Sequence, residues 1–319
     1  MKDYRWAAIG CGDIARQFAQ AMRQEGRTLY GVANRTYEKA AAFAEEYSIP
    51  RVYERISDVF TDENVDIVYI ATPHNTHSGY INEALRHGKH VLCEKAITLD
   101  IGELKEAQVL AEERGLVLAE AMTIYHMPLY KRLREIAEGG ALGKLCMIQM
   151  NFGSFKEYDM TNRFFNPDLA GGALWDIGVY ALSFIRWFMS CCPDRIASQV
   201  KYAPSGVDEQ VGILLMNGAD EMATAALTLH AKQPKRGMAA FEKGFLEIQE
   251  YPRADRAVIT FTEDGRRETV ELGSSTDALR YEIRDMEVSV SGGADEMHLD
   301  YSLDVSWMMT EIRRIWETA

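Results

Sequence analysis

The sequence has few of the features that mark secreted proteins, proteins with structural zinc sites or membrane-spanning proteins. Its five cysteines are an odd number and form no C-x-x-C pair, so we expect neither a disulfide framework nor a structural zinc site but a reducing compartment. Eight prolines and 24 glycines are too few for a low-complexity chain. The most apolar long stretch, 173–189, contains Asp176 and Arg186, and no signal segment opens the chain. We therefore expect a cytoplasmic protein without a membrane span.

Basic residues are also scarce relative to acidic ones. Lys and Arg number 35 against 48 Asp and Glu, which gives a formal net charge of -13. A surface of that sign repels phosphates, so nucleic acid and anionic membranes are not expected partners. One phosphate could still bind in a local basic pocket. The length of 319 residues suggests two domains at roughly 150 residues each.

The first 122 residues alternate short apolar runs with helical patterns. The predicted strands are 6–10, 28–33, 67–71, 90–93 and 116–119, and the predicted helices are 14–23, 37–47, 78–87 and 101–114. Alternating strands and helices indicate βαβ units and a parallel sheet covered on both faces. We therefore predict an α/β Rossmann domain over residues 1–122.

The pattern changes in the second half. The predicted strands, most with period-2 character, are 145–151, 196–202, 211–216, 222–229, 245–248, 257–261 and 268–272, and the predicted helices are 129–138, 173–189, 277–290 and 302–317. Turn residues between the runs indicate hairpins and meanders. We predict an α+β domain with a large, open, mostly antiparallel sheet over residues 123–319.

A glycine-rich turn follows the first predicted strand. Gly10 permits a tight turn, Gly12 lets backbone N–H groups approach a pyrophosphate, and the small Ala15 allows close helix–strand packing. The helix that begins at Asp13 and Ile14 favours an anion at its N-terminus. Because the turn opens a βαβ repeat, we predict a dinucleotide site here.

The residues after the second predicted strand bear on the choice of cofactor. An NAD site usually has an Asp or Glu about 20 residues beyond the glycines, whereas this chain has Asn34 and Arg35. Arg35 could stack on adenine and bind a 2′-phosphate, or it could be a solvated loop residue. The pattern favours NADP, with NAD possible.

Three further stretches carry a resemblance to a known family. They are 71–77 (ATPHNTH), 91–96 (VLCEKA) and 171–180 (GGALWDIGVY). Together they resemble the Gfo/Idh/MocA oxidoreductases, and the resemblance covers the whole chain in order. It implies a Rossmann domain followed by an open antiparallel sheet that often forms the dimer contact, and hence a homodimer or larger homo-oligomer.

The resemblance implies three catalytic residues. Lys95 matches the lysine of the family's Glu-Lys-Pro motif, and Asp176 and Tyr180 match the second motif. The spacing of Asp176 and Tyr180 independently puts both on one helix face. Lys and Tyr both have reference pKa values near 10, so either pKa must fall for the group to act as a base. We assign proton transfer to Tyr180 assisted by Lys95, with the reverse division open, and orientation to Asp176.

The remaining predicted site residues contact the cofactor. They are Gly10, Gly12, Asp13, Ile14, Asn34, Arg35, Ala71, Thr72, His74, Asn75, His77, Glu94 and Lys95. No Cys or carboxylate completes a metal set with the two histidines, so we predict cofactor contact or helix capping and no metal. Arg163 is either a cofactor or substrate contact or a solvated loop residue.

Two positions depart from the family pattern. Ala96 replaces the usual proline, whose bond relatives often hold in cis, and Tyr125 stands where many relatives have arginine, which suggests a different substrate.

We predict an NADP-dependent oxidoreductase acting on a secondary hydroxyl or carbonyl of a sugar, polyol or related carbinol. The alternatives are a glycosidase that retains its cofactor and a non-catalytic NADP sensor.

Overall fold

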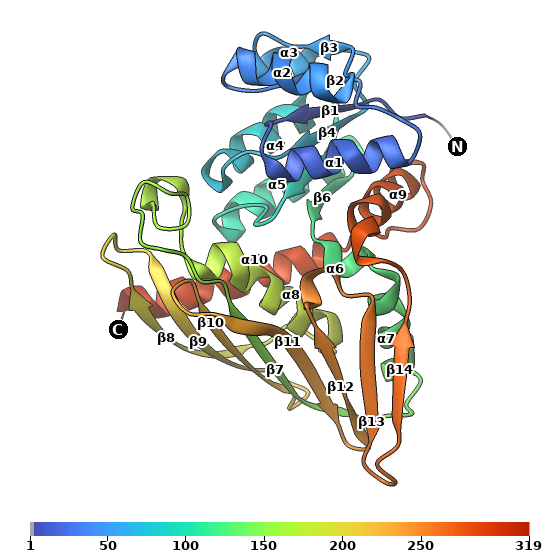
Figure 1. The fold of residues 1–319 in the computed structure, drawn as a ribbon, viewed down its shortest axis with the longest axis vertical. Helices are drawn as coiled ribbons and strands as arrows, with labels where there is room; N and C mark the ends of the chain where they lie inside the picture. The colour runs from blue at the N-terminus through green and yellow to red at the C-terminus, as the bar shows by residue number, and fades with distance from the viewer. Residues whose placement is uncertain (1–2, 319) are drawn as a thin grey trace. The chain divides into compact units, whose positions relative to one another are not determined.

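The computed structural model describes residues 3–318, which form two compact units (Figure 1). The first unit runs to Ala121 and also includes Asp277–Leu299. The second comprises Met122–Thr276 and the chain from Asp300 onward. The predicted Rossmann domain and the predicted mostly antiparallel domain are both confirmed.

The first unit alternates strands and helices. Its elements are β1 (Trp6–Ile9), α1 (Asp13–Gln24), β2 (Gly31–Ala33), α2 (Tyr37–Tyr47), β3 (Arg51–Val52), α3 (Ile56–Thr61), β4 (Ile67–Ile70), η1 (His74–Thr76), α4 (His77–Arg86), β5 (His90–Glu94), α5 (Ile101–Arg114), β6 (Leu118–Ala121) and α9 (Ala278–Val290). The six strands are parallel in the order β3-β2-β1-β4-β5-β6. Strand order reverses between β1 and β4, so ligands are expected at the carboxyl ends of these strands.

Helix α9 joins the first unit, although the sequence prediction placed it in the domain over 123–319. Ile283 and Met286 belong to the same apolar core as Trp6. The Trp6 indole Nε1 also donates to the Glu287 carboxylate at 2.8 Å. A buried indole N–H needs such an acceptor, so this bond and the apolar contacts hold α9 to the start of the chain.

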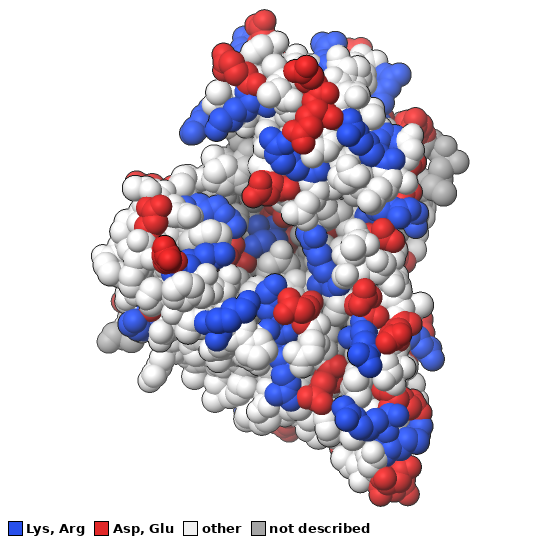
Figure 2. All heavy atoms as spheres, in the orientation of Figure 1, with Lys and Arg blue, Asp and Glu red and all other residues white. Residues whose placement is uncertain are grey.

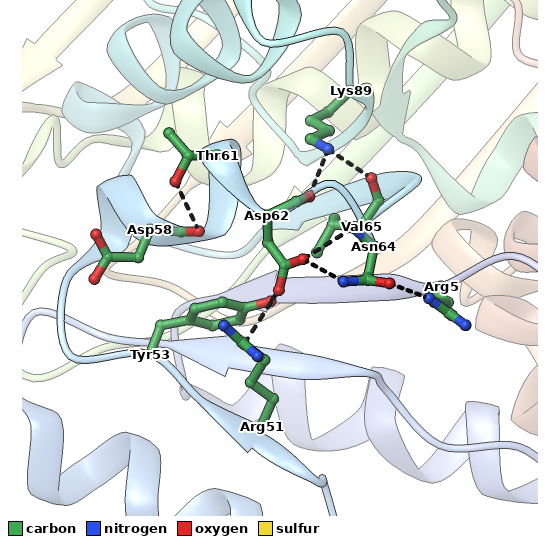
Figure 3. A network of polar contacts seen from close by, with 9 residues as sticks. All are labelled: Arg5, Arg51, Tyr53, Asp58, Thr61, Asp62, Asn64, Val65 and Lys89. Atoms are coloured by element: carbon green, nitrogen blue, oxygen red, sulfur yellow. Dashed lines mark hydrogen bonds and ion pairs between the residues drawn. The ribbon is translucent and has the colours of Figure 1, made fainter.

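A side-chain network ties the amino ends of β1, β4 and β5 together (Figure 3). The Asp62 carboxylate accepts from Tyr53 Oη at 2.8 Å and from the Asn64 backbone N–H at 2.9 Å. Lys89 Nζ donates to the carbonyl oxygens of Asp62 and Val65 at 2.6 and 2.9 Å. Side chains therefore fix the amino ends of these strands. A ligand would bind at the opposite, carboxyl ends.

The second unit is built on one large sheet. Its elements are α6 (Thr123–His126), α7 (Pro128–Glu138), β7 (Leu145–Gly153), η2 (Pro167–Leu169), η3 (Leu174–Gly178), α8 (Val179–Phe188), β8 (Arg195–Tyr202), β9 (Asp208–Met216), β10 (Met222–Thr228), β11 (Gln233–Phe241), β12 (Gly244–Gln249), η4 (Tyr251–Arg253), β13 (Arg256–Phe261), β14 (Arg267–Glu271), η5 (Ser275–Asp277) and α10 (Leu299–Thr318). The strand order is β14-β13-β12-β11-β7-β10-β9-β8. Among the described strands, β7 and β10 pair in parallel and the other neighbouring pairs are antiparallel.

Helices of this unit pack on one face of the sheet. Within the helical layer, Trp187 Nε1 of α8 donates to the Tyr130 carbonyl of α7 at 3.1 Å, and Arg186 Nε donates to Asp304 of α10 at 2.6 Å. Residues on β8 and β9 alternate between more and less buried, as expected when the opposite face is not covered. Leu214 on β9 is 43% exposed, so this outer face carries apolar as well as polar side chains.

Charged side chains of both signs are interspersed on the face shown in Figure 2. Surface ion pairs of the protein include Arg256 with Glu271 and Lys235 with Glu250, both at 3.0 Å. Such pairs contribute little to stability. The segment Pro167–Phe188 is apolar enough to cross a membrane by length and composition alone, but 67% of its most apolar window is buried inside the fold.

Candidate functional site

The glycine turn after β1 has the geometry of a phosphate-binding turn. Gly10 has φ +105°, and a Cβ there would lie 2.2 Å from the Ala71 carbonyl oxygen; only glycine fits. A Cβ on Gly12 would instead meet no described atom within 4 Å, and no described side chain caps the first turn of α1. The open space and the unpaired N–H groups suit a pyrophosphate. The structure thus fits a dinucleotide at Gly10, Gly12, Asp13 and Ile14.

Asn34 and Arg35 lie beyond the carboxyl end of β2. Asn34 Nδ2 donates to the Thr36 carbonyl at 3.0 Å and so shapes the turn into α2. Arg35 is exposed, which leaves its guanidinium accessible to a ligand. No carboxylate stands at either position.

The segment Ala71–His77 follows β4, next to β1 in the sheet. Ala71 packs against Gly10, as described above, and Thr72 Oγ1 contacts Thr76 Oγ1 at 2.7 Å. His74 and Asn75 lie on the short helix η1. This segment therefore forms one wall beside the phosphate-binding turn.

Lys95 follows β5, and the Lys95–Ala96 peptide bond is cis although Ala96 is not proline. Ring nitrogen Nε2 of His74 lies 3.0 Å from the Lys95 carbonyl oxygen. The Ile97 backbone N–H donates to the Glu120 carboxylate of β6 at 3.0 Å. The backbone on both sides of the cis bond is thus bonded to side chains from neighbouring strand ends, and Lys95 itself is partly exposed.

His77, which the sequence predicts to contact the cofactor, lies between backbone carbonyls of two turns. It is fully buried, its Nδ1 lies 2.9 Å from the Ala96 carbonyl oxygen, and its Nε2 lies 2.8 Å from the Thr72 carbonyl oxygen. Burial lowers the pKa of His77, although both carbonyls favour the charged ring. Because its two ring nitrogens face carbonyl oxygens of Thr72 and Ala96, His77 bridges the turns after β4 and β5.

Glu94, also predicted to contact the cofactor, bonds to a tyrosine of the core. The buried Tyr69 hydroxyl donates to its carboxylate at 2.5 Å, and Tyr69 stacks on Phe18 in the core, with ring centroids 3.8 Å apart. Burial, with the Glu94 charge added, raises the pKa of Tyr69 well above its usual value. Glu94 is therefore bonded to the core of the first unit, and its contact with the cofactor stays a prediction.

In the second unit, Asp176 lies at the centre of a π-helical turn. Leu174–Gly178 winds as a π-helix and continues directly into α8, so the predicted helix over 173–189 is present but its first turn is not α-helical. π-turns are frequent at functional sites. Arg163 Nη2 donates to Asp176 Oδ1 at 3.3 Å. Asp176 is largely buried, at 13% side-chain exposure, and Arg163 is exposed at 57%.

Two glycines explain how the Arg163 segment reaches this turn. A Cβ on Gly171 would lie 2.8 Å from the carbonyl oxygens of Arg163 and Phe164. A Cβ on Gly178 would lie 2.9 Å from Leu227 Cδ1 of β10. Gly171 therefore lets the backbone of the Arg163 segment approach the start of the turn, and Gly178 lets the end of the turn lie close to β10.

Tyr180 is the second residue of α8 and is partly exposed. Its ring lies 6.5 Å from that of Phe152 on β7. Tyr125, which we expected to reflect substrate choice, is fully buried and stacks on Trp187 with centroids 5.7 Å apart. It is a core aromatic of the second unit.

Sequence reasoning missed two supporting carboxylates. Glu120 offered a signal, because a carboxylate in a buried strand is costly unless bonded. The sequence around Asp208 gave no such signal. Its carboxylate accepts from the Leu174 N–H at 2.7 Å, and the two residues are 34 positions apart, so no local pattern contains the contact.

Comparison with known proteins agrees with this arrangement. Residues 4–122 match the model of the oxidoreductase family with an NAD-binding Rossmann fold, and residues 130–247 match the GFO/IDH/MocA C-terminal domain. The chain is 31% identical over 293 residues to D-xylose 1-dehydrogenase (NADP(+)) 2 of Haloferax volcanii, covering 90% of this chain and 88% of that one. It is 29% identical over 251 residues to mouse trans-1,2-dihydrobenzene-1,2-diol dehydrogenase, covering 77% and 74%.

Solved structures share the fold at lower identity. The 3-ketoreductase KijD10 from Actinomadura kijaniata, solved with NADP and TDP-benzene, has a TM-score of 0.87 at 23% identity and covers 98% of both chains. The two matched family models and the extended similarity to the Haloferax volcanii enzyme settle the assignment. The chain belongs to the Gfo/Idh/MocA family and is an NAD(P)-dependent oxidoreductase of that family.

Proposed function

We propose that this protein transfers a hydride between NADP and a secondary hydroxyl or carbonyl of a sugar, polyol or related carbinol. The observation that carries the proposal is that the three turns after β1, β4 and β5 lie together at the carboxyl ends of the parallel strands. The phosphate-binding turn after β1 packs on Ala71 after β4, and the turn after β4 is bonded through His74 and His77 to the turn that carries Lys95. A bound cofactor would supply the hydride chemistry at this edge.

The preference for NADP rests on Arg35. An exposed guanidinium at the end of β2, with no carboxylate beside it to repel a 2′-phosphate, suits NADP. The name of the xylose dehydrogenase given above includes NADP(+), and KijD10 was solved with NADP. Both facts support the proposal.

Three side chains would act on the substrate. Oxidation of a carbinol needs a group that takes the hydroxyl proton, and we assign that step to Tyr180, assisted by the Lys95 ammonium. Asp176, paired with Arg163, would orient the substrate hydroxyl. The reverse division, with Lys95 as the base, predicts the same loss on Lys95→Ala but a smaller loss on Tyr180→Phe.

We also propose a cytoplasmic homodimer. The five free cysteines suit a reducing compartment. The outer face of β8–β10, with Leu214 43% exposed, is the surface we assign to the contact between two copies.

The test is absorbance at 340 nm with NADP or NAD against aldoses, polyols, inositols and dihydrodiols. Reduction with NADP and little with NAD would support the proposal. Reduction with NAD alone would overturn the assignment to Arg35. Absence of reduction with every substrate, together with release of free sugar from a glycoside, would favour the cofactor-retaining glycosidase.

A further inference from the structure

Asp208 is a buried carboxylate that the proposed reaction does not use directly. It is the first residue of β9 and is 7% exposed. Its Oδ2 accepts from the backbone N–H of Leu174 at 2.7 Å. Leu174 is the first residue of the π-helical turn that carries Asp176. A carboxylate at this point satisfies an N–H group that the helix itself leaves unpaired.

Gly172 makes room for this carboxylate. Its φ is +125°, and a Cβ there would lie 2.0 Å from Asp208 Oδ1 and 2.8 Å from Cγ. Only glycine therefore permits both the backbone conformation and the contact. The second glycine of the Gly-Gly pair and Asp208 form one structural unit.

We propose that Asp208 is a positioning residue for the reaction proposed above: it holds the start of the η3–α8 helix and thereby sets the place of Asp176 and Tyr180. Three contacts define that turn. Asp208 bonds its first N–H, the Asp176 N–H donates to the Gly172 carbonyl at 3.2 Å, and the Asp176 carboxylate pairs with Arg163. Loss of the Asp208 carboxylate would release the first of these contacts and loosen the others.

The electrostatics of Asp208 give the proposal a pH signature. Burial raises the pKa of Asp208 to about 7, while the N–H groups of Leu174, Asp208 and Ala173 and the cation of Arg313 on α10 favour the ionised form. The Arg313 guanidinium also lies 5.6 Å from the Trp175 ring centroid. A group with this pKa changes charge within the working range of most enzymes.

The test compares Asp208→Ala and Asp208→Asn with a matched control, Glu221→Gln. Glu221 is also a buried carboxylate, and it accepts from the Ser190 N–H at 2.8 Å beyond the other end of α8. Hydrogen–deuterium exchange is measured for the peptide spanning 172–180. We expect exchange there to rise about tenfold or more in Asp208→Ala, to rise less in Asp208→Asn, and to stay unchanged in Glu221→Gln.

Steady-state kinetics supply the second readout. We expect Asp208→Ala to lower kcat about 10- to 100-fold with the KM for NADP nearly unchanged. The wild-type kcat profile should show an inflection near pH 7 that Asp208→Asn lacks. If Asp208→Ala does not fold, Asp208→Asn alone decides through the loss of that inflection.

Unchanged exchange over 172–180 and an unchanged kcat in the Asp208 variants would overturn the proposal. Failure of the proposed function is distinct from that result. A wild-type protein without turnover on any substrate would contradict the proposed function, whereas the exchange measurement would still confirm or refute the role of Asp208 in holding the turn.

Discussion

The turn after β5 and the turn before α8 each carry residues proposed to act on the substrate, but different groups hold them. Side chains from neighbouring strand ends bond to the backbone around Lys95: the His74 and His77 rings and the Glu120 carboxylate. Around Asp176, glycines allow close backbone approach and one buried carboxylate, Asp208, bonds the first N–H.

This difference gives the two turns opposite responses to pH. The pKa of His77 is lowered by burial, so its contribution to stability is present above the ordinary pKa near 6.5 and is lost as the pH falls. The pKa of Asp208 is raised to about 7, so its contribution is present below the ordinary carboxyl pKa and is lost as the pH rises through 7. The two turns proposed to act in one reaction are thus held by groups whose contributions to stability change with pH in opposite directions.

The largest effect is expected from Lys95→Ala. Loss of the ammonium should lower kcat about 1,000-fold, because proton transfer would lose its charged partner, while NADP binding should change less than about tenfold. Stopped-flow turnover and fluorescence titration with NADPH measure the two quantities. Lys105→Ala, at an exposed position on α5, is the control; an equal loss of kcat in both variants would contradict the assignment.

The second prediction is that alanine substitutions at Gly172 and Gly12 have different effects, one on stability and the other on NADP binding. Gly172→Ala should destabilise the second unit by roughly 2–4 kcal/mol, because its positive φ and the Asp208 contact both exclude a Cβ. Gly12→Ala should leave stability unchanged and weaken NADP binding about tenfold or more, because its Cβ would fill the phosphate space. Thermal unfolding and NADP titration test this pair. A stable Gly172→Ala protein with normal exchange over 172–180 would show that the turn tolerates a side chain.

These two glycines also show what sequence could predict. Gly12 lies in a local motif between a strand and a helix, so its role followed from spacing. The contact of Gly172 with Asp208 joins residues 36 apart, so no motif contained it. The strand β11 was missed because Pro234 and Gly237 weaken its strand pattern. Gly237 is there because the Phe184 ring of α8 would lie 2.7 Å from its Cβ, a tertiary requirement that outweighs local propensity.

The opposite pH responses are the third prediction. Protection from hydrogen exchange, corrected for the intrinsic rate, should fall over 71–77 as the pH drops below about 6.5 and fall over 172–180 as it rises through about 7. His77→Gln should flatten the first response alone and Asp208→Asn the second alone. Parallel responses in the two peptides would refute the comparison.

The smallest effect concerns cofactor choice. Arg35→Ala should raise the Kd for NADP about 10- to 100-fold, since a charged contact to the 2′-phosphate is lost, and change the Kd for NAD by less than about twofold. Isothermal titration with each cofactor measures both constants. Equal weakening for the two cofactors would place Arg35 on the adenine ring rather than on the phosphate.

The central claim is that the protein transfers a hydride directly between the carbinol carbon of the substrate and NADP. The measurement is mass spectrometry of the nicotinamide after incubation with NADP and a substrate deuterated at the reacting carbinol carbon, chosen from the compounds that support reduction. We predict that deuterium appears in the NADPH formed by the wild-type protein and that Lys95→Ala forms about 1,000-fold less of this labelled NADPH in the same time. Formation of NADPH without deuterium would contradict hydride transfer from the carbinol.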